Sequence, residues 1–306
     1  MAQFRREFFS TLEQMLKVSG EPLLQDRWPL TDPANLSARV LRLGLAVSAF
    51  AMLEKYVSAV FEHLVEKDVS SALMGFAALP DDIRDFIVVD SAIGINNRLS
   101  FVKGSPERLN YITQTLDLIV KYKEVPPAYT ALGFSPKGSN VGHEDIKRAF
   151  STFGVKDAWG KMNTLAADYG GAVLSLNENY KALSNARHEA AHDPVSSIPV
   201  ADLQSHIRSA IVIGICCDVL AKNAGAAIKV CLDKKDLGKD VASYKRASRF
   251  LDEQADGSWL ERASPAAKGT KRYPSRADGI AGALVRAGAP FVIVRDQTGQ
   301  PIELAG

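Results

Sequence analysis

The 306-residue chain has few cysteines, no excess of charge of either sign and no apolar run of membrane-spanning length. Its three cysteines are Cys216, Cys217 and Cys231. Two are adjacent and the third lies far along the same predicted helix, so no pair has disulfide geometry. We therefore expect buried, reduced thiols, as in a cytoplasmic protein. The formal net charge of +2 gives no overall preference for a class of partner.

The chain also lacks a recognisable targeting signal. The two most apolar runs, 43–53 and 209–217, are bounded by charged residues, and each is shorter than a bilayer-spanning helix. The first residues contain no apolar core followed by a small-residue cleavage site, so we expect no signal peptide. These features favour a cytoplasmic location.

Apolar residues recur at three- and four-residue spacing along the first 232 residues, which is the pattern of amphipathic helices. The segment 126–140 is rich in Pro, Gly and Ser and predicts a loop. The expected fold class is mainly α, with a multi-helix domain over residues 1–240. The helices expected in it cover about 3–17, 36–66, 80–98, 105–119, 143–153, 159–169, 172–192 and 202–232.

The tail has a different pattern. Short runs of strand-forming residues flank turns at Asp256-Gly257 and Thr298-Gly299, and an amphipathic helix lies between the two pairs. This predicts a small α+β domain of β-β-α-β-β order over residues 246–306. A polar, lysine-rich segment, 233–245, connects it to the helices. The tail looks like a small bacterial domain family of unknown function, a likeness that adds no chemistry.

The stretch from Ser184 to Pro194 reads Ser-Asn-Ala-Arg-His-Glu-Ala-Ala-His-Asp-Pro and holds two of the five histidines. On the predicted helix, Arg187 occupies a position of the apolar seam where another apolar residue is expected. A charge there is costly unless it is paired or faces a functional site. Two interpretations follow: Arg187 pairs with a buried carboxylate such as Glu54, or it serves a site.

One reading of this stretch is a zinc site. His188 to His192 matches His-Glu-x-x-His, in which two histidines one turn apart bind zinc and the glutamate acts as general base. However, no glutamate occurs between Glu189 and Glu253 to act as the usual third ligand. The carboxylates left for that role are Asp202 and Asp218. A zinc peptidase is therefore the less favoured alternative.

Arg187 and His192 also form an Arg-x4-His motif at the end of a helix. This resembles the HEPN superfamily, whose all-helical ribonucleases carry such a motif, and in particular its RiboL-PSP type. The resemblance covers about residues 1–235. It rests on the motif, on the early helix around Leu53-Glu54-Lys55-Tyr56, and on the loop 138–140 that leads into Ile146-Lys147-Arg148-Ala149-Phe150. His188 stands where the family commonly has asparagine.

The residue types fit metal-free RNA cleavage, in which the 2′-hydroxyl attacks the neighbouring phosphate. Histidine transfers protons near neutral pH, which suits His192. The permanently charged guanidinium of Arg187 stabilises negative charge on the phosphate oxygens. Five residues at about 100° each place the two side chains roughly 140° apart on one helix. A two-fold dimer would bring them together.

The resemblance implies a metal-independent endoribonuclease that needs no cofactor and leaves 2′,3′-cyclic phosphate and 5′-hydroxyl ends. It also implies RNA as substrate, a homodimer formed through the helix that ends at His192, and a toxin or phage-defence setting with an antitoxin or other regulatory protein. A HEPN module that binds RNA or a partner without cleavage is the alternative.

Further residues are candidates for supporting roles. His188 lies one turn before His192 and is expected to assist it. The candidate substrate-binding residues are Asn185, Glu54, Lys271 and Arg272. The last two belong to a cluster that joins basic and aromatic residues, as a nucleic-acid surface does, although a solvated loop has the same composition. The cluster consists of Lys268, Lys271, Arg272, Tyr273 and Arg276.

Overall fold

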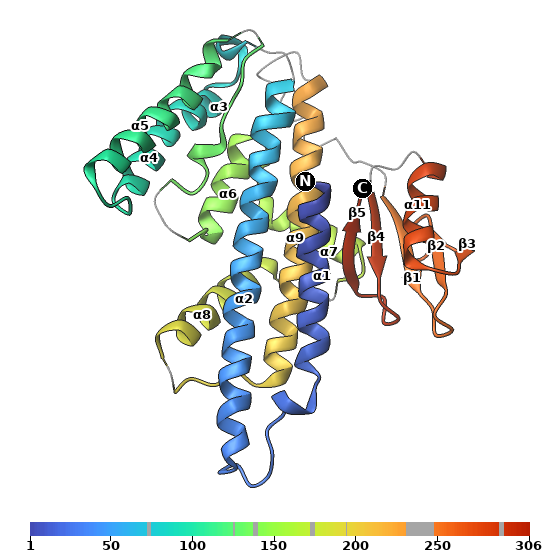
Figure 1. Ribbon diagram of the computed structural model, residues 1–306. Coiled ribbons are helices and arrows are strands. Elements are labelled where there is room, and N and C mark those ends of the chain that lie inside the picture. Colours follow the sequence, from blue (N-terminus) through green and yellow to red (C-terminus); the bar gives the residue numbers. More distant parts are fainter. Residues whose placement is uncertain are drawn as a thin grey trace. The chain divides into compact units, whose positions relative to one another are not determined.

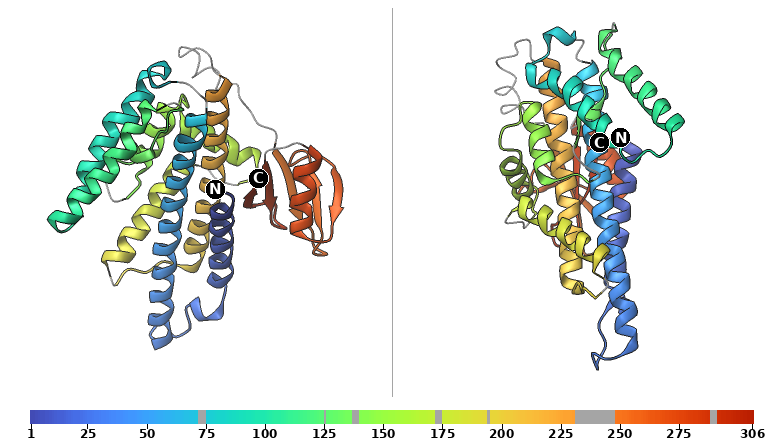
Figure 2. Two further views of the ribbon diagram at one scale, coloured as in Figure 1. Left: turned by 45° about the horizontal axis from the view of Figure 1, so that its top comes forward. Right: turned by 90° about the vertical axis from the view of Figure 1, so that its left-hand side faces the viewer.

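The computed structural model describes residues 1–71, 75–124, 126–136, 140–171, 175–193, 195–230, 248–287 and 291–306 (Figures 1 and 2). The chain folds as two compact units. Unit 1 comprises residues 1–56, 161–217 and 246–306, and unit 2 comprises residues 57–160 and 218–245. Two long helices, α2 (Pro33–His63) and α9 (Val200–Val230), contribute to both units. The predicted connection 233–245 lies outside the described residues.

The helical part of unit 1 is built around aromatic side chains. The ring of Phe8, on α1 (Ala2–Ser19), stacks on Tyr56 of α2 with centroids 4.0 Å apart. Gly214 of α9 permits this approach, since a Cβ there would lie 2.6 Å from the Phe8 ring. The helices α1, α2 and α9 accordingly run side by side (Figures 1 and 2). The predicted helices at 3–17 and 36–66 are confirmed.

The C-terminal part of unit 1 is a five-stranded mixed sheet in the order β3-β2-β1-β4-β5. Its central strands, β1 and β4, are parallel, and the other neighbouring pairs are antiparallel. Helix α11 packs against the sheet through Ala283 and Ile280, which contact Leu251, Trp259 and Val292. The elements are β1 (Ser248–Glu253), β2 (Trp259–Arg262), β3 (Gly269–Tyr273), α11 (Arg276–Ala287), β4 (Phe291–Arg295) and β5 (Pro301–Ala305).

The predicted β-β-α-β-β order is wrong in one respect, because β3 is an additional strand before α11. Four of its five residues are exposed, so its sequence has no alternation of apolar and polar residues that would predict a strand. Its backbone pairs with β2, where Leu260 lies opposite Arg272 and Trp259 opposite Tyr273. Three members of the basic and aromatic cluster, Lys271, Arg272 and Tyr273, therefore lie on an edge strand.

Polar contacts join this sheet to the helices of unit 1. Arg208 of α9 forms an ion pair with Asp296 at 3.1 Å. Tyr169, which follows α7 (Ala158–Asp168), packs edge-on against Phe250 with ring centroids 5.9 Å apart. Helix α1 lies beside β5 (Figure 1). The sheet thus shares unit 1 with the helices.

Unit 2 is helical around a second aromatic core. Phe61, from the end of α2, stacks on Phe134 at 4.5 Å and meets Phe150 edge-on at 4.8 Å. The single helix predicted over 80–98 is divided by the π-helical segment Phe86–Asp90. The helices of this unit include α3 (Asp81–Asp85), α4 (Ser91–Leu99), α5 (Ser105–Val120) and α6 (His143–Thr152).

Cys216 and Cys217 are buried free thiols, as expected, and burial raises the pKa of Cys216 well above its usual value. Cys231 lies outside the described residues. Two helical stretches, Pro33–Val69 and Val200–Lys229, are long and apolar enough to cross a bilayer. The expectation that neither region is long enough is therefore wrong. The apolar window of the second stretch is 94% buried, as in the core helix of a water-soluble protein, and that of the first is 39% buried. Cytoplasmic location stays a prediction.

Candidate functional site at the end of helix α8

Helix α8 (Leu176–His192) carries the Arg-x4-His motif in its last turns. Ser175 caps its start by accepting a hydrogen bond from the backbone N–H of Glu178 at 3.3 Å. Tyr180 packs edge-on against Phe50 of α2, with ring centroids 5.5 Å apart. Leu183 is the last fully buried residue of the helix, so its first half packs in the core and its second half lies at the surface.

Arg187 is half-buried, and it makes no hydrogen bond or ion pair with any residue that the structure describes. The expected alternative, a core arginine neutralised by Glu54, is therefore not what the structure shows. Glu54 is itself half-buried on α2. A partly dehydrated guanidinium with no carboxylate beside it can bind an anion such as phosphate.

His188 and His192 are brought together by the helix. Both are exposed, and their rings lie 4.6 Å apart between centroids. Helix α8 ends at His192, as predicted, and the carboxylate of Asp193 accepts a hydrogen bond from the backbone N–H of Val195 at 3.0 Å. Asn185 is exposed on the same helix. Pro194, the last residue of the motif stretch, lies outside the described residues.

The two predicted catalytic residues do not converge within one chain. Because α8 is a regular α-helix through His192, the five-residue spacing leaves Arg187 and His192 roughly 140° apart around its axis. His192 instead has His188 as its neighbour. A site that uses both Arg187 and His192 would therefore need a second surface.

The zinc interpretation lacks a third ligand. Among the residues that the structure describes, no group of three His, Cys, Asp or Glu side chains is close enough to hold a metal ion. The pair of His188 and His192 has the one-turn spacing of the zinc motif, but neither Asp202 nor Asp218 joins it in such a group. Structural and catalytic zinc sites take at least three protein ligands.

The basic cluster of the tail is only partly available as a nucleic-acid surface. Its aromatic member, Tyr273, is buried and donates a hydrogen bond to Glu261 at 2.8 Å. Lys271 is exposed, with its amine 4.9 Å from the centroid of the Tyr273 ring. Arg272 is exposed but already pairs with Asp256 at 2.6 Å. Tyr273 is therefore not available as an exposed aromatic member of the cluster, and substrate binding by Lys271 and Arg272 stays a prediction.

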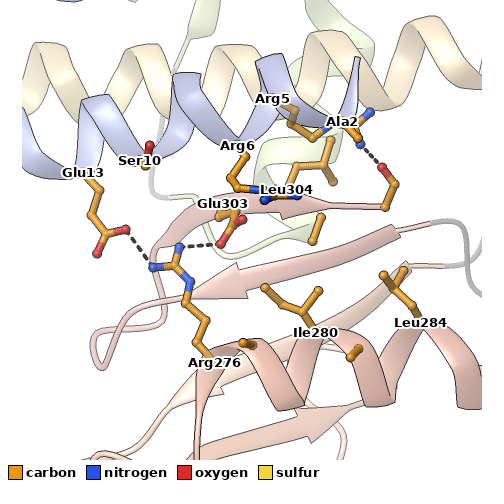
Figure 3. A pocket seen from close by; sticks show the side chains of 14 residues that line it. Ala2, Arg5, Arg6, Ser10, Glu13, Arg276, Ile280, Leu284, Glu303 and Leu304 are labelled. Carbon is orange, nitrogen blue, oxygen red and sulfur yellow. Dashed lines mark hydrogen bonds and ion pairs between the residues drawn. The ribbon is translucent and has the colours of Figure 1, made fainter.

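A cavity of about 750 Å³ lies between α1, α11 and β5, and the sequence did not reveal it. Figure 3 shows the side chains that line it. At one end, Arg276 lies between Glu13 and Glu303, at 2.7 and 2.6 Å. Arg6 points from α1 into the cavity, and the opposite wall includes Ile280. These two ion pairs join α1 and β5 to α11 at this end of the cavity.

Comparison of the chain with protein-family models, with curated proteins and with solved structures gives no match. The fold and the site therefore carry the functional argument: a mainly helical protein with a small C-terminal mixed sheet, whose surface presents an arginine and two histidines at the end of one helix.

Proposed function

We propose that the protein is a metal-independent endoribonuclease of the HEPN type, acting as a homodimer. The observation that carries the proposal is the state of Arg187: a half-buried guanidinium without a partner among the described residues, on the same helix end as two exposed histidines. Both histidines are accessible to an RNA strand. Buried charges are normally paired, so an unpaired one at the surface of a motif-bearing helix favours a binding role.

In the proposed reaction, His192 accepts the proton of the 2′-hydroxyl while the bond from that oxygen to phosphorus forms. Arg187 binds the non-bridging oxygens and stabilises the added negative charge. The bond from phosphorus to the 5′-oxygen then breaks, and that oxygen takes a proton from an imidazolium, a role that suits His188. The products are a 2′,3′-cyclic phosphate and a 5′-hydroxyl.

The decisive experiment is cleavage of a mixed RNA pool by purified protein, with and without EDTA. We expect Arg187→Ala to lower the cleavage rate by about 10²–10³, the loss typical when one charge-stabilising group is removed. Glu189→Ala is the matched control, because Glu189 is an exposed residue of the same helix turn. Cleavage that disappears with EDTA and with Glu189→Ala would replace the proposal by the zinc interpretation. Binding of RNA without cleavage would leave a non-catalytic HEPN module.

The homodimer has its own test. If Arg187 of one protomer acts with His192 of the other, mixing inactive Arg187→Ala and His192→Ala proteins restores one intact site per mixed dimer. Random exchange makes half of the dimers mixed, so about a quarter of the wild-type activity should return. No recovery after demonstrated exchange would refute a shared site.

The toxin or defence setting is part of the same proposal. It predicts that expression of the wild-type chain slows growth of the host and that Arg187→Ala relieves this effect. Equal growth with both chains, at equal soluble protein levels, would contradict it.

A further inference from the structure

Unit 2 contains a polar cavity of about 270 Å³ that lies apart in sequence from the α8 motif. Its walls come from three parts of the chain: the end of α2, the end of α4 with the residues after it, and residues within 131–136 and 140–141. The side chains used below are Glu62 of α2, Arg98 of α4, Phe101, and Asn140. Pockets for drug-sized ligands start at about 300 Å³, so this cavity suits a single ring system.

The part of this wall that residues 131–136 form is held tightly against its neighbours. Phe134 stacks on Phe61 at 4.5 Å, and the side-chain amide of Asn97 donates a hydrogen bond to the carbonyl of Pro136 at 2.6 Å. Gly133 sits so close to the backbone of Phe86 that a Cβ would lie 2.3 Å from the Phe86 oxygen. The cavity is therefore formed by fixed packing.

Ser135 is the strained point of this wall. It has a positive φ of 47°, a conformation that residues with a side chain rarely adopt. Its hydroxyl donates to the carbonyl oxygen of Asn140 at 3.3 Å and lies 3.1 Å from the carboxylate of Asp145. These contacts hold the turn beside the cavity in a conformation that it would not adopt alone.

Phe101 gives the cavity an exposed flat surface. Its side chain is 67% exposed, and its ring contacts no other ring among the residues that the structure describes. A large aromatic ring left in water at the wall of a polar cavity is a platform on which a planar ligand can stack.

The polar groups around the platform include both signs of charge. The guanidinium of Arg98 makes no hydrogen bond or ion pair with another residue in the described part of the chain. Partial burial and the charge of Glu66 raise the pKa of Glu62, while the charge of Arg98 opposes this rise. The carboxyl oxygens of Glu62 accept hydrogen bonds from N–H groups such as those on the edge of a nucleobase. Asn140 also lines the cavity.

We propose that this cavity binds one nucleotide of a single-stranded RNA, with the base stacked on Phe101 and the phosphate beside Arg98. The hydrogen-bonding edge of the base faces Glu62 and Asn140. The choice of RNA rests on the proposed ribonuclease function, whereas the recognition of a nucleotide rests on this cavity alone. A free nucleotide has the same chemistry, and the experiment separates the two sources.

The test measures binding of a labelled eight-nucleotide RNA by fluorescence anisotropy, in an Arg187→Ala background that keeps the strand intact. We expect Phe101→Ala to weaken binding roughly tenfold or more, the effect of losing one stacked base. Phe101→Tyr keeps the ring and should bind within about twofold of the parent. Leu109→Ala is the matched control, since Leu109 is also 67% exposed, in the same unit, and does not line the cavity.

Calorimetric titrations with AMP and with ribose 5-phosphate identify the recognised group. AMP should bind to the protein with Phe101 intact and should bind more weakly to the Phe101→Ala protein. Ribose 5-phosphate, which has no base to stack, should not bind to either. Tight binding of AMP with no binding of the oligonucleotide would make a free nucleotide the ligand and overturn the RNA assignment. Equal binding of RNA by the Phe101→Ala and Leu109→Ala proteins would refute the proposal that this cavity binds a nucleotide.

Cleavage by the wild-type chain is measured separately, so the two proposals fail in different ways. Loss of cleavage in Arg187→Ala with unchanged binding in Phe101→Ala would retain the nuclease and reject the cavity. Phe101-dependent binding of RNA without any cleavage by the wild-type chain would retain the nucleotide-binding cavity and reject the nuclease.

Discussion

Glu261 is the buried centre of a charge network in the C-terminal sheet, and replacing it gives a strong test of what holds that part of unit 1 together. Its side chain is fully buried and accepts hydrogen bonds from Arg249 at 3.0 and 2.5 Å and from the Tyr273 hydroxyl at 2.8 Å. Arg286 lies 3.3 Å from its second oxygen. Every acceptor position of the carboxylate therefore faces a donor.

The expected cost follows from the groups left behind. Removing one member of a buried ion pair typically costs about 3–5 kcal/mol, because the remaining charge stays dehydrated. Arg249 is 18% exposed and loses its partner, whereas Arg286 is 39% exposed and can be solvated. We therefore expect Glu261→Ala to destabilise the sheet by about 3 kcal/mol, the lower end of that range. Glu261→Gln keeps one acceptor and should cost about 1.5–3 kcal/mol.

Hydrogen exchange followed by mass spectrometry measures the loss of stability of the sheet itself, from the exchange rates of peptides that cover β1 and β2. A loss of 3 kcal/mol raises the exchange of their slowest amides by on the order of a hundredfold. The control is Arg272→Gln, which breaks the exposed pair with Asp256, whose side chains are 55% and 59% exposed. That change should cost less than about 1 kcal/mol. Equal protection in Glu261→Ala and Arg272→Gln would refute the reasoning.

The same network predicts a pH dependence. Burial opposes ionisation of Glu261, but the hydrogen bonds from Arg249 and Tyr273 and the charges of Arg286 and Arg249 outweigh it and lower its pKa below the usual 4.5. A carboxyl whose folded pKa is depressed stabilises the fold above its unfolded pKa. This stabilisation should be present above about pH 4.5 and should be lost as the pH falls through the lowered pKa. Glu261→Gln should flatten that part of the stability profile.

Four further predictions concern the two units. Gly133→Ala should reduce the free energy of unfolding by about 1–3 kcal/mol, because its Cβ would lie 2.3 Å from the oxygen of Phe86. The change should appear as a lower melting temperature. Gly44→Ala, where no atom lies within 4 Å, should instead stabilise α2 by about 0.5–1 kcal/mol; a lower melting temperature for Gly44→Ala would contradict this. Ser175→Ala removes the cap of α8 and should cost about 1 kcal/mol in urea unfolding, and an unchanged midpoint would show that the cap is dispensable. Burial lowers the pKa of His206, so the stability it contributes is complete above its usual pKa of 6.5 and is lost as the pH falls below that value; a His206→Gln protein with the same loss of stability between pH 7.5 and 5.5 would exclude His206 as the cause.

The sequence alone determined the helices of this protein and the position of its motif. Apolar spacing placed α1, α2, α5, α6 and α8 close to their observed bounds, because a helix that buries one face must repeat its apolar residues with the period of the helix. The same period predicted that His188 and His192 lie one turn apart, and their rings are adjacent. The buried state of Cys216 and Cys217 also followed from their place on an apolar helix.

Only the tertiary structure decided which side chains meet across segments. Strand β3 was missed because its stability comes from hydrogen bonds to β2 and not from an apolar face of its own. Tyr273, expected at the surface beside basic residues, is instead buried against Glu261. The absence of a partner for Arg187 among the described residues, and the gathering of Glu62, Arg98 and Phe101 around one cavity, depend on contacts between distant parts of the chain. Periodicity reports which face of an element is buried, but it carries no information about the neighbour that buries it.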